Sequence, residues 1–191
     1  SWLRGFFTEL GRAQQLAHTA SGAVTETFPL GLRGVTDAAG RLVAGWLADP
    51  GFLEANGMGA TDAAAVVGHA RLEALHEART VAATTLWHHD LASGADPGEA
   101  WLARAPVTPD ADDASALPDR LDAIYALDSL QMCLLTAATE HRLFSDHGER
   151  WWWSEDAGAA LSAMWSQGQR KSAAEHVGDL VDGEGGLAAA A

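Results

Sequence analysis

Residues 61–93 read TDAAAVVGHARLEALHEARTVAATTLWHHDLAS, and this stretch decides the fold class. It opens with Thr61 and Asp62, residue types that cap helix N-termini, and contains no proline. Apolar side chains then recur at helical spacing, at Leu72, Leu75, Ala82 and Leu86. The pattern predicts one long helix with these residues on its apolar side.

Helical patterns continue on both sides of this stretch. We predict further helices over 2–18, 36–48, 118–146, 155–167 and 171–181, and a short helix around Trp101. We expect Thr36 or Asp37 to cap the second of these helices and Asp49-Pro50-Gly51 to stop it.

The helix over 118–146 is apolar on most sides between Ile124 and Ala138, so we expect it to be buried centrally. The stretches 20–34 and 106–118 have the composition of loops. No segment alternates as a strand does. The sequence predicts an all-α, multi-helix domain over 1–181 and a flexible tail over 182–191.

Charge and cysteine content narrow the partners and the compartment. The chain has 12 Lys and Arg against 26 Asp and Glu, a formal charge of -14, which would repel nucleic acid and anionic membranes. No apolar segment approaches the roughly 20 residues that span a bilayer. Cys133 is the single cysteine, so no intrachain disulfide can form, and a cytoplasmic location fits.

Residues 6–19 read FFTELGRAQQLAHT. With His at Thr8, Arg12 and Gln15 the segment would contain HELGHAQHLAH, so it resembles the zinc-binding helix of the oligopeptidase-like and angiotensin-converting-enzyme-like peptidases. In that HExxH family, two His at i and i+4 hold Zn²⁺ and the Glu between them is the general base. Glu9 stands at the general-base position. Thr8 offers only a weak neutral oxygen and Arg12 is a permanent cation, so neither replaces a ligand histidine.

Further segments resemble the same family in the same order, over approximately residues 6–180. Asp37 follows Arg12 by 37 − 12 = 25 residues, the place of the family's third ligand, a Glu on the next helix. The DPGFL sequence at 49–53 and the tryptophan-rich region 148–169 also look like family segments. Within the helix carrying 125–132, Ser129 aligns with a Tyr that polarises the scissile carbonyl in the family.

The resemblance implies the fold of the C-terminal helical half of such peptidases, with the zinc lost and no cofactor in its place. We expect a non-catalytic, degenerate subunit that binds a partner protein or peptide through the vestigial cleft, with Glu9, Arg12 and Asp37 as binding residues. The Arg12 guanidinium is expected to bridge the two carboxylates. Because the family's N-terminal half has no counterpart here, we also expect a partner chain, one that supplies that half or an intact peptidase-like subunit.

Two other functions stay open. The old cleft could support zinc-independent chemistry, with Glu9 as acid or base and Arg12 binding a small anionic or peptide-like substrate. Residual zinc peptidase activity is a weaker alternative.

Other candidate features favour a structural interpretation. His69, Glu73 and His76 share a helix face, but solvated side chains explain them better than a metal site does. The Trp151–Trp153 run favours packing over ligand binding, and Cys133 is expected to be a buried, inert thiol.

Overall fold

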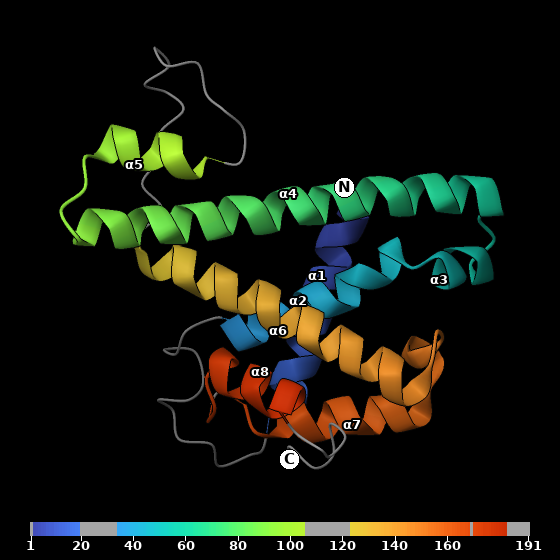
Figure 1. Cartoon of the computed structure of the whole chain (residues 1–191). Helices are drawn as coiled ribbons and strands as arrows, with labels where there is room; N and C mark the ends of the chain where they lie inside the picture. The colour runs from blue at the N-terminus through green and yellow to red at the C-terminus, as the bar shows by residue number, and fades with distance from the viewer. Residues whose placement is uncertain (1, 20–33, 106–122, 169, 183–191) are drawn as a thin grey trace. The chain divides into compact units, whose positions relative to one another are not determined.

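The computed structural model describes residues 2–19, 34–105, 123–168 and 170–182, and its regular structure there is helical, with no β-strand among them (Figure 1). The helices are α1 (Trp2–His18), α2 (Gly34–Gly45), η2 (Trp46–Ala48), α3 (Pro50–Ala55), α4 (Ala60–Ala92), α5 (Pro97–Arg104), α6 (Ala123–His147), η4 (Trp151–Trp153), α7 (Glu155–Ser166) and α8 (Ala173–Asp182), of which η2 and η4 are 3-10 helices. The predicted all-α, multi-helix fold is confirmed. The two predicted loops and the predicted tail fall mainly outside the described residues.

The chain divides into two compact units, which we describe one at a time. Unit 1 comprises Ser1–Gly68 and Gln131–Ala191, and unit 2 comprises His69–Leu130. No described helix is both long enough and apolar enough to cross a membrane.

In unit 1, α1 and α2 pack with their backbones in direct contact. A Cβ atom on Gly11 would overlap the carbonyl oxygen of Ala39, and one on Gly40 would lie 2.7 Å from the carbonyl oxygen of Thr8. These obstacles are backbone atoms, which cannot rotate away as a flexible side chain could. The two glycines therefore allow this close approach, which brings the side chains of both helices together.

The main core of unit 1 lies between α2, α6, α7 and α8. Buried apolar side chains from each helix fill it, among them Leu42, Leu135, Leu161 and Leu180. Ser154 caps α7, because its side chain accepts a hydrogen bond from the backbone N–H of Ala157.

In unit 2, α5 packs on the last turns of α4. The ring centroids of Trp87 and Trp101 lie 6.0 Å apart at an interplanar angle of 72°. Trp87 Nε1 donates a hydrogen bond to the carbonyl oxygen of Pro97 at 3.0 Å, which ties the two helices together across their connection.

Two predicted helix signals act differently in the structure. Asp49-Pro50-Gly51 begins α3, where Asp49 Oδ1 accepts a hydrogen bond from the N–H of Phe52 at 2.8 Å and Pro50 occupies the first turn. The predicted stop is confirmed, because the preceding 3-10 helix ends at Ala48, and the same residues also start a new helix, since proline needs no hydrogen bond at the first helical position. The second helix already includes Gly34, so Thr36 and Asp37 lie in its first turn instead of capping it.

The buried faces of the two longest helices also differ from the prediction. Leu72 and Leu75 of α4 are 68% and 58% exposed, and the buried side of its later turns carries Trp87. On α6, Leu134 is 52% exposed while its neighbour Leu135 is 1% exposed, so this helix is buried on one side only. Apolar spacing marks faces that can be buried, and the large aromatic side chain decides which face the packing uses.

Candidate functional site

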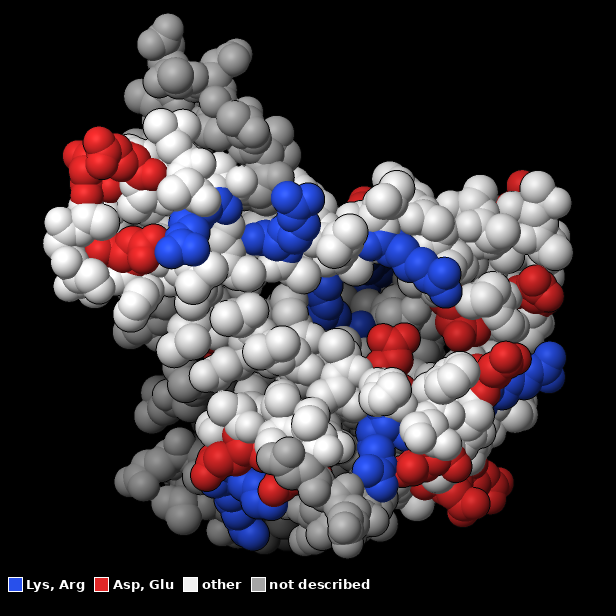
Figure 2. Space-filling model, in the orientation of Figure 1, with Lys and Arg blue, Asp and Glu red and all other residues white. Residues whose placement is uncertain are grey.

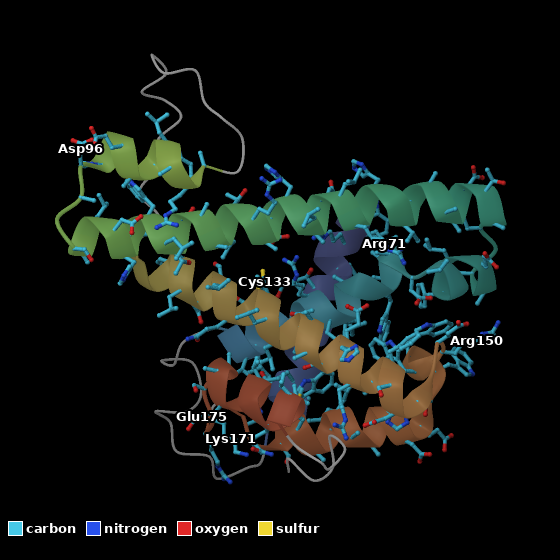
Figure 3. All side chains as sticks on the ribbon, in the orientation of Figure 1. Arg71, Asp96, Cys133, Arg150, Lys171 and Glu175 are labelled. Atoms are coloured by element: carbon cyan, nitrogen blue, oxygen red, sulfur yellow. The ribbon has the colours of Figure 1, made fainter. Side chains whose placement is uncertain are left out.

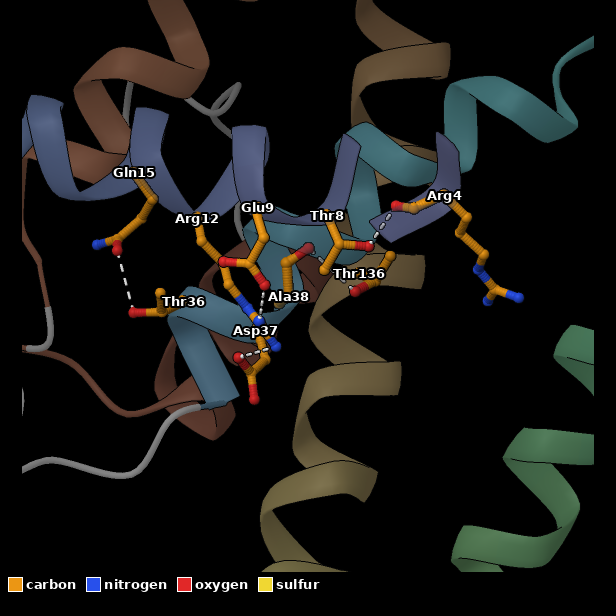
Figure 4. A network of polar contacts seen from close by, with 9 residues as sticks. All are labelled: Arg4, Thr8, Glu9, Arg12, Gln15, Thr36, Asp37, Ala38 and Thr136. Carbon is orange, nitrogen blue, oxygen red and sulfur yellow. Dashed lines mark hydrogen bonds and ion pairs between the residues drawn. The ribbon is translucent and has the colours of Figure 1, made fainter. Parts of the chain in front are cut away.

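The four residues Thr8, Glu9, Arg12 and Asp37 come together where α1 meets α2, and we call this group the α1–α2 site. Arg12 reaches across from α1 and contacts both acids (Figure 4). Its Nη2 atom lies 2.9 Å from Asp37 Oδ1, and its Nη1 atom forms an ion pair with Glu9 Oε1 on the preceding turn. The guanidinium thus holds two carboxylates from two helices at one place.

The burial of these groups sets the strength of the contacts. The side chain of Arg12 is 35% exposed and that of Asp37 26%, whereas the side chain of Glu9 is 69% exposed. Water screens the Glu9 pair, which lies within α1, more strongly than the Asp37 pair, which is the one that joins the two helices. The Arg12 Nε atom is buried and has no hydrogen-bond partner, so the fork of this guanidinium is not fully satisfied.

Thr8 uses its hydroxyl within its own helix. Its Oγ1 donates a hydrogen bond to the carbonyl oxygen of Arg4 at 2.9 Å, as threonines in helices often do (Figure 4). The hydroxyl is therefore not directed as a free ligand toward Asp37.

A second polar link between the helices lies one turn further along. Gln15 is 1% exposed, and its Oε1 accepts a hydrogen bond from Thr36 Oγ1 at 3.0 Å. Its Nε2 donates to Thr19 Oγ1 at 3.2 Å, which satisfies the other end of the amide. The sequence singled out Gln15 only for its resemblance to a family histidine. The structure makes it a buried connector.

The residues at this site do not fit a zinc ion. Zinc sites use thiolate, neutral imidazole and carboxylate ligands, and here the only such groups are the carboxylates of Glu9 and Asp37, both already paired with the Arg12 cation. Arg12 carries a permanent positive charge and donors only.

The structure does not assemble the relocated histidine site either. His69 Nε2 lies 3.2 Å from Glu73 Oε1 on an exposed face, and His76 is not part of that contact. Across the described ranges, no three His, Cys, Asp or Glu side chains are grouped so that they could hold a metal ion.

Ser129 lies in unit 2, whereas the four residues of the α1–α2 site lie in unit 1. Cys133 on α6 is only half-buried, in contrast to the full burial that its apolar neighbours predicted (Figure 3).

The three consecutive tryptophans have different environments, as predicted. Trp151 is 5% exposed and packs against Trp46 at a centroid distance of 6.4 Å, while Trp153 is 82% exposed. Trp152 packs edge-on against Phe52, 5.3 Å away, and the exposed ring of Trp153 packs edge-on against Trp152 at 6.1 Å.

Sequence reasoning missed two buried polar residues, Thr139 and His176, each 2% exposed. Thr139 Oγ1 and His176 Nε2 are both buried without a hydrogen-bond partner, and both residues line the same small cavity. A signal for His176 was present, because it lies between Ala173 and Leu180 at helical spacing on the apolar side of the last predicted helix.

The surface charge agrees with the overall composition. On the face drawn in Figure 2, Lys and Arg side chains are interspersed with Asp and Glu among many uncharged residues, without one dominant basic region.

Comparison of the chain with protein-family models, with curated proteins and with solved structures gives no match.

Proposed function

We propose that this chain is a non-catalytic, metallopeptidase-like helical subunit, in which the Arg12 guanidinium takes the place of a metal ion. The observation that carries the proposal is the double ion pair of Arg12 with Glu9 and Asp37 at the contact of α1 and α2. A zinc peptidase needs a divalent cation and an open coordination position there to activate water. A guanidinium neutralises the same two carboxylates but cannot polarise a water molecule as a metal does.

The proposed task is to bind a partner protein or peptide, in a cytoplasmic setting. Support comes from the first two turns of α1, which expose Trp2 (82%) and Phe6 (56%) just before Thr8. Aromatic side chains are enriched where proteins bind one another. The partner would be a chain supplying a complementary helical half or an intact peptidase-like subunit.

Restoring the family's ligands tests the origin of the site. We expect the triple variant Thr8→His, Arg12→His, Asp37→Glu to bind one zinc ion per chain, measured by metal analysis after dialysis against a weak chelator. The matched control is Gln14→His, which pairs with His18 at the same i, i+4 spacing on exposed positions of α1. A control that retains zinc as well as the triple variant would contradict the proposal.

Zinc content and peptidase assays of the natural sequence test the loss of catalysis. We expect less than stoichiometric zinc and no chelator-sensitive hydrolysis of peptides. Zinc-independent turnover that disappears in Glu9→Gln, with the helical content unchanged, would instead support the alternative in which Glu9 acts as acid or base.

Partner binding is tested by surface variants in the full chain. The double variant Trp2→Ser, Phe6→Ser should lose partners that co-purify with the natural sequence from its own cells, with unchanged circular dichroism. The control Val181→Ser removes another exposed apolar side chain (70% exposed) on α8 and should retain them. Equal recovery with both variants would rule out the start of α1 as the binding surface.

A further inference from the structure

His176 occupies an unusual position for a titratable side chain. It faces the core of unit 1 from α8, 2% exposed, on the same side of the helix as the buried Ala173 and Leu180. Its Nε2 atom is buried and has no hydrogen-bond partner. A buried imidazole usually has a partner at both nitrogens, so this position calls for an explanation.

The cavity beside His176 is small and almost wholly apolar. Its volume is about 10 Å³, room for about one water molecule and for no larger ligand. Thr139 also lines it, and its Oγ1 is likewise buried without a hydrogen-bond partner. The remaining lining residues come from α2, α6 and α7 and are uncharged: Val35, Ala38, Ala39, Leu42, Leu135, Met164 and Trp165.

Among the described residues, the charges that act on His176 lie on α8 or just before it. Lys171 forms an ion pair with Asp179 at 2.8 Å, and Glu175 accepts hydrogen bonds from Ser172 at the start of the helix (Figure 3). Burial, and then the charge of Lys171, lower the pKa of His176 below 6.5, whereas Asp179 and Glu175 act weakly in the opposite direction.

We propose that His176 is a proton-operated latch: the neutral imidazole lets α8 pack on α2, α6 and α7, and protonation of the imidazole releases α8. Protonation of the neutral imidazole would place a full charge beside a cavity whose other lining residues, Thr139 included, are all uncharged. When α8 moves away, water hydrates the imidazolium, so protonation lowers the free energy of the released state relative to the packed state.

The direction of the effect follows from proton linkage. The released helix binds a proton at the ordinary pKa of about 6.5, whereas the packed helix binds it only at lower pH. Packing of α8 is therefore fully favourable above that pH and weakens as the pH falls below it. One proton changes the equilibrium by at most about ten-fold per pH unit.

Hydrogen exchange of the full chain tests the latch. Deuterium uptake is measured by mass spectrometry at about pH 7.5 and about pH 5.5, with exposure times scaled for the intrinsic rate, a range in which histidine titrates. We expect the peptide covering α8 to lose protection by several-fold, up to about ten-fold, at the lower pH. Peptides from α1 should not change, because the histidine of this helix, His18, is exposed.

Three variants make the test specific. His176→Leu and His176→Gln should both keep α8 equally protected at the two pH values, and the second serves if the first does not fold. The control His141→Gln changes an exposed histidine on α6, and in this variant α8 should still lose protection at the lower pH. Equal protection of α8 at both pH values in the natural sequence would overturn the proposal. So would a pH step that persists in a folded His176 variant.

Discussion

Replacing Gly11 by Ala should push α1 and α2 apart. The new Cβ would lie 2.8 Å from the Cα of Gly40, whereas ordinary contact begins at 3.4 Å, so the helices must separate locally by at least 3.4 − 2.8 = 0.6 Å. Overpacking of this kind costs about 1–3 kcal/mol, and the upper part applies because the obstacle is backbone. Alanine's higher helix propensity offsets about 1 kcal/mol. The expected net loss in the free energy of unfolding is about 1–2 kcal/mol.

The assay is urea unfolding followed by far-UV circular dichroism, compared with Gly5→Ala. Gly5 lies in the same helix with no atom within 4 Å of its would-be Cβ, so that variant should gain about 0.5–1 kcal/mol. The same contrast applies on α2 between Gly40→Ala, blocked by the Thr8 carbonyl at 2.7 Å, and Gly45→Ala, which is unobstructed. If Gly11→Ala were as stable as Gly5→Ala, the close contact between the two helices would be refuted.

Three further perturbations probe the α1–α2 site and α8. Arg12→Met should lower the free energy of unfolding by about 1–2 kcal/mol, a value between those for exposed and buried ion pairs. In a double-mutant cycle, the same substitution made in the Asp37→Asn variant should lose much less, because the partner of Arg12 is already gone. Ser172→Ala should cost about 0.5–2 kcal/mol in urea unfolding, because the Ser172 hydroxyl accepts a hydrogen bond from the N–H of Glu175 while the Ser172 N–H donates one to the Glu175 carboxylate. An unchanged midpoint would contradict this capping box. Hydrogen bonds from Ser172 lower the pKa of Glu175 below 4.5. The stabilisation of the folded chain by the Glu175 carboxylate is therefore complete above that pH and is lost as the pH falls further. This loss of stability in acid should disappear in Glu175→Gln.

Part of the α1–α2 site could be predicted from the sequence. Glu9 and Arg12 stand three residues apart on a helix, a spacing that places them on one face whatever else the chain does. For Arg12 to contact Asp37, α2 must also pack against α1 at the right position and angle. Local signals predicted the second helix, but the pairing of Asp37 with Arg12 was expected only through resemblance to a peptidase family, and the structure brings the two side chains to 2.9 Å.

The buried polar residues were less predictable. Gln15, Thr139 and His176 all belong to types that are usually exposed or only half-buried, so their burial does not follow from residue type. Gln15 is buried because Thr36 and Thr19 satisfy its amide. His176 is buried because the apolar neighbours on its helix face carry it into the core.

The helices themselves were determined by the sequence, because apolar period, caps, prolines and glycines act within a few residues of one another. The first helix, Trp2–His18, has the predicted bounds, and the all-α class follows from the same local signals. The tertiary structure alone decided which apolar faces are covered: Trp87 of α4 is buried, but Leu72 remains exposed. Local periodicity says which faces can be buried, but burial itself depends on shape complementarity between segments far apart in the chain, as at Gly11 and Gly40.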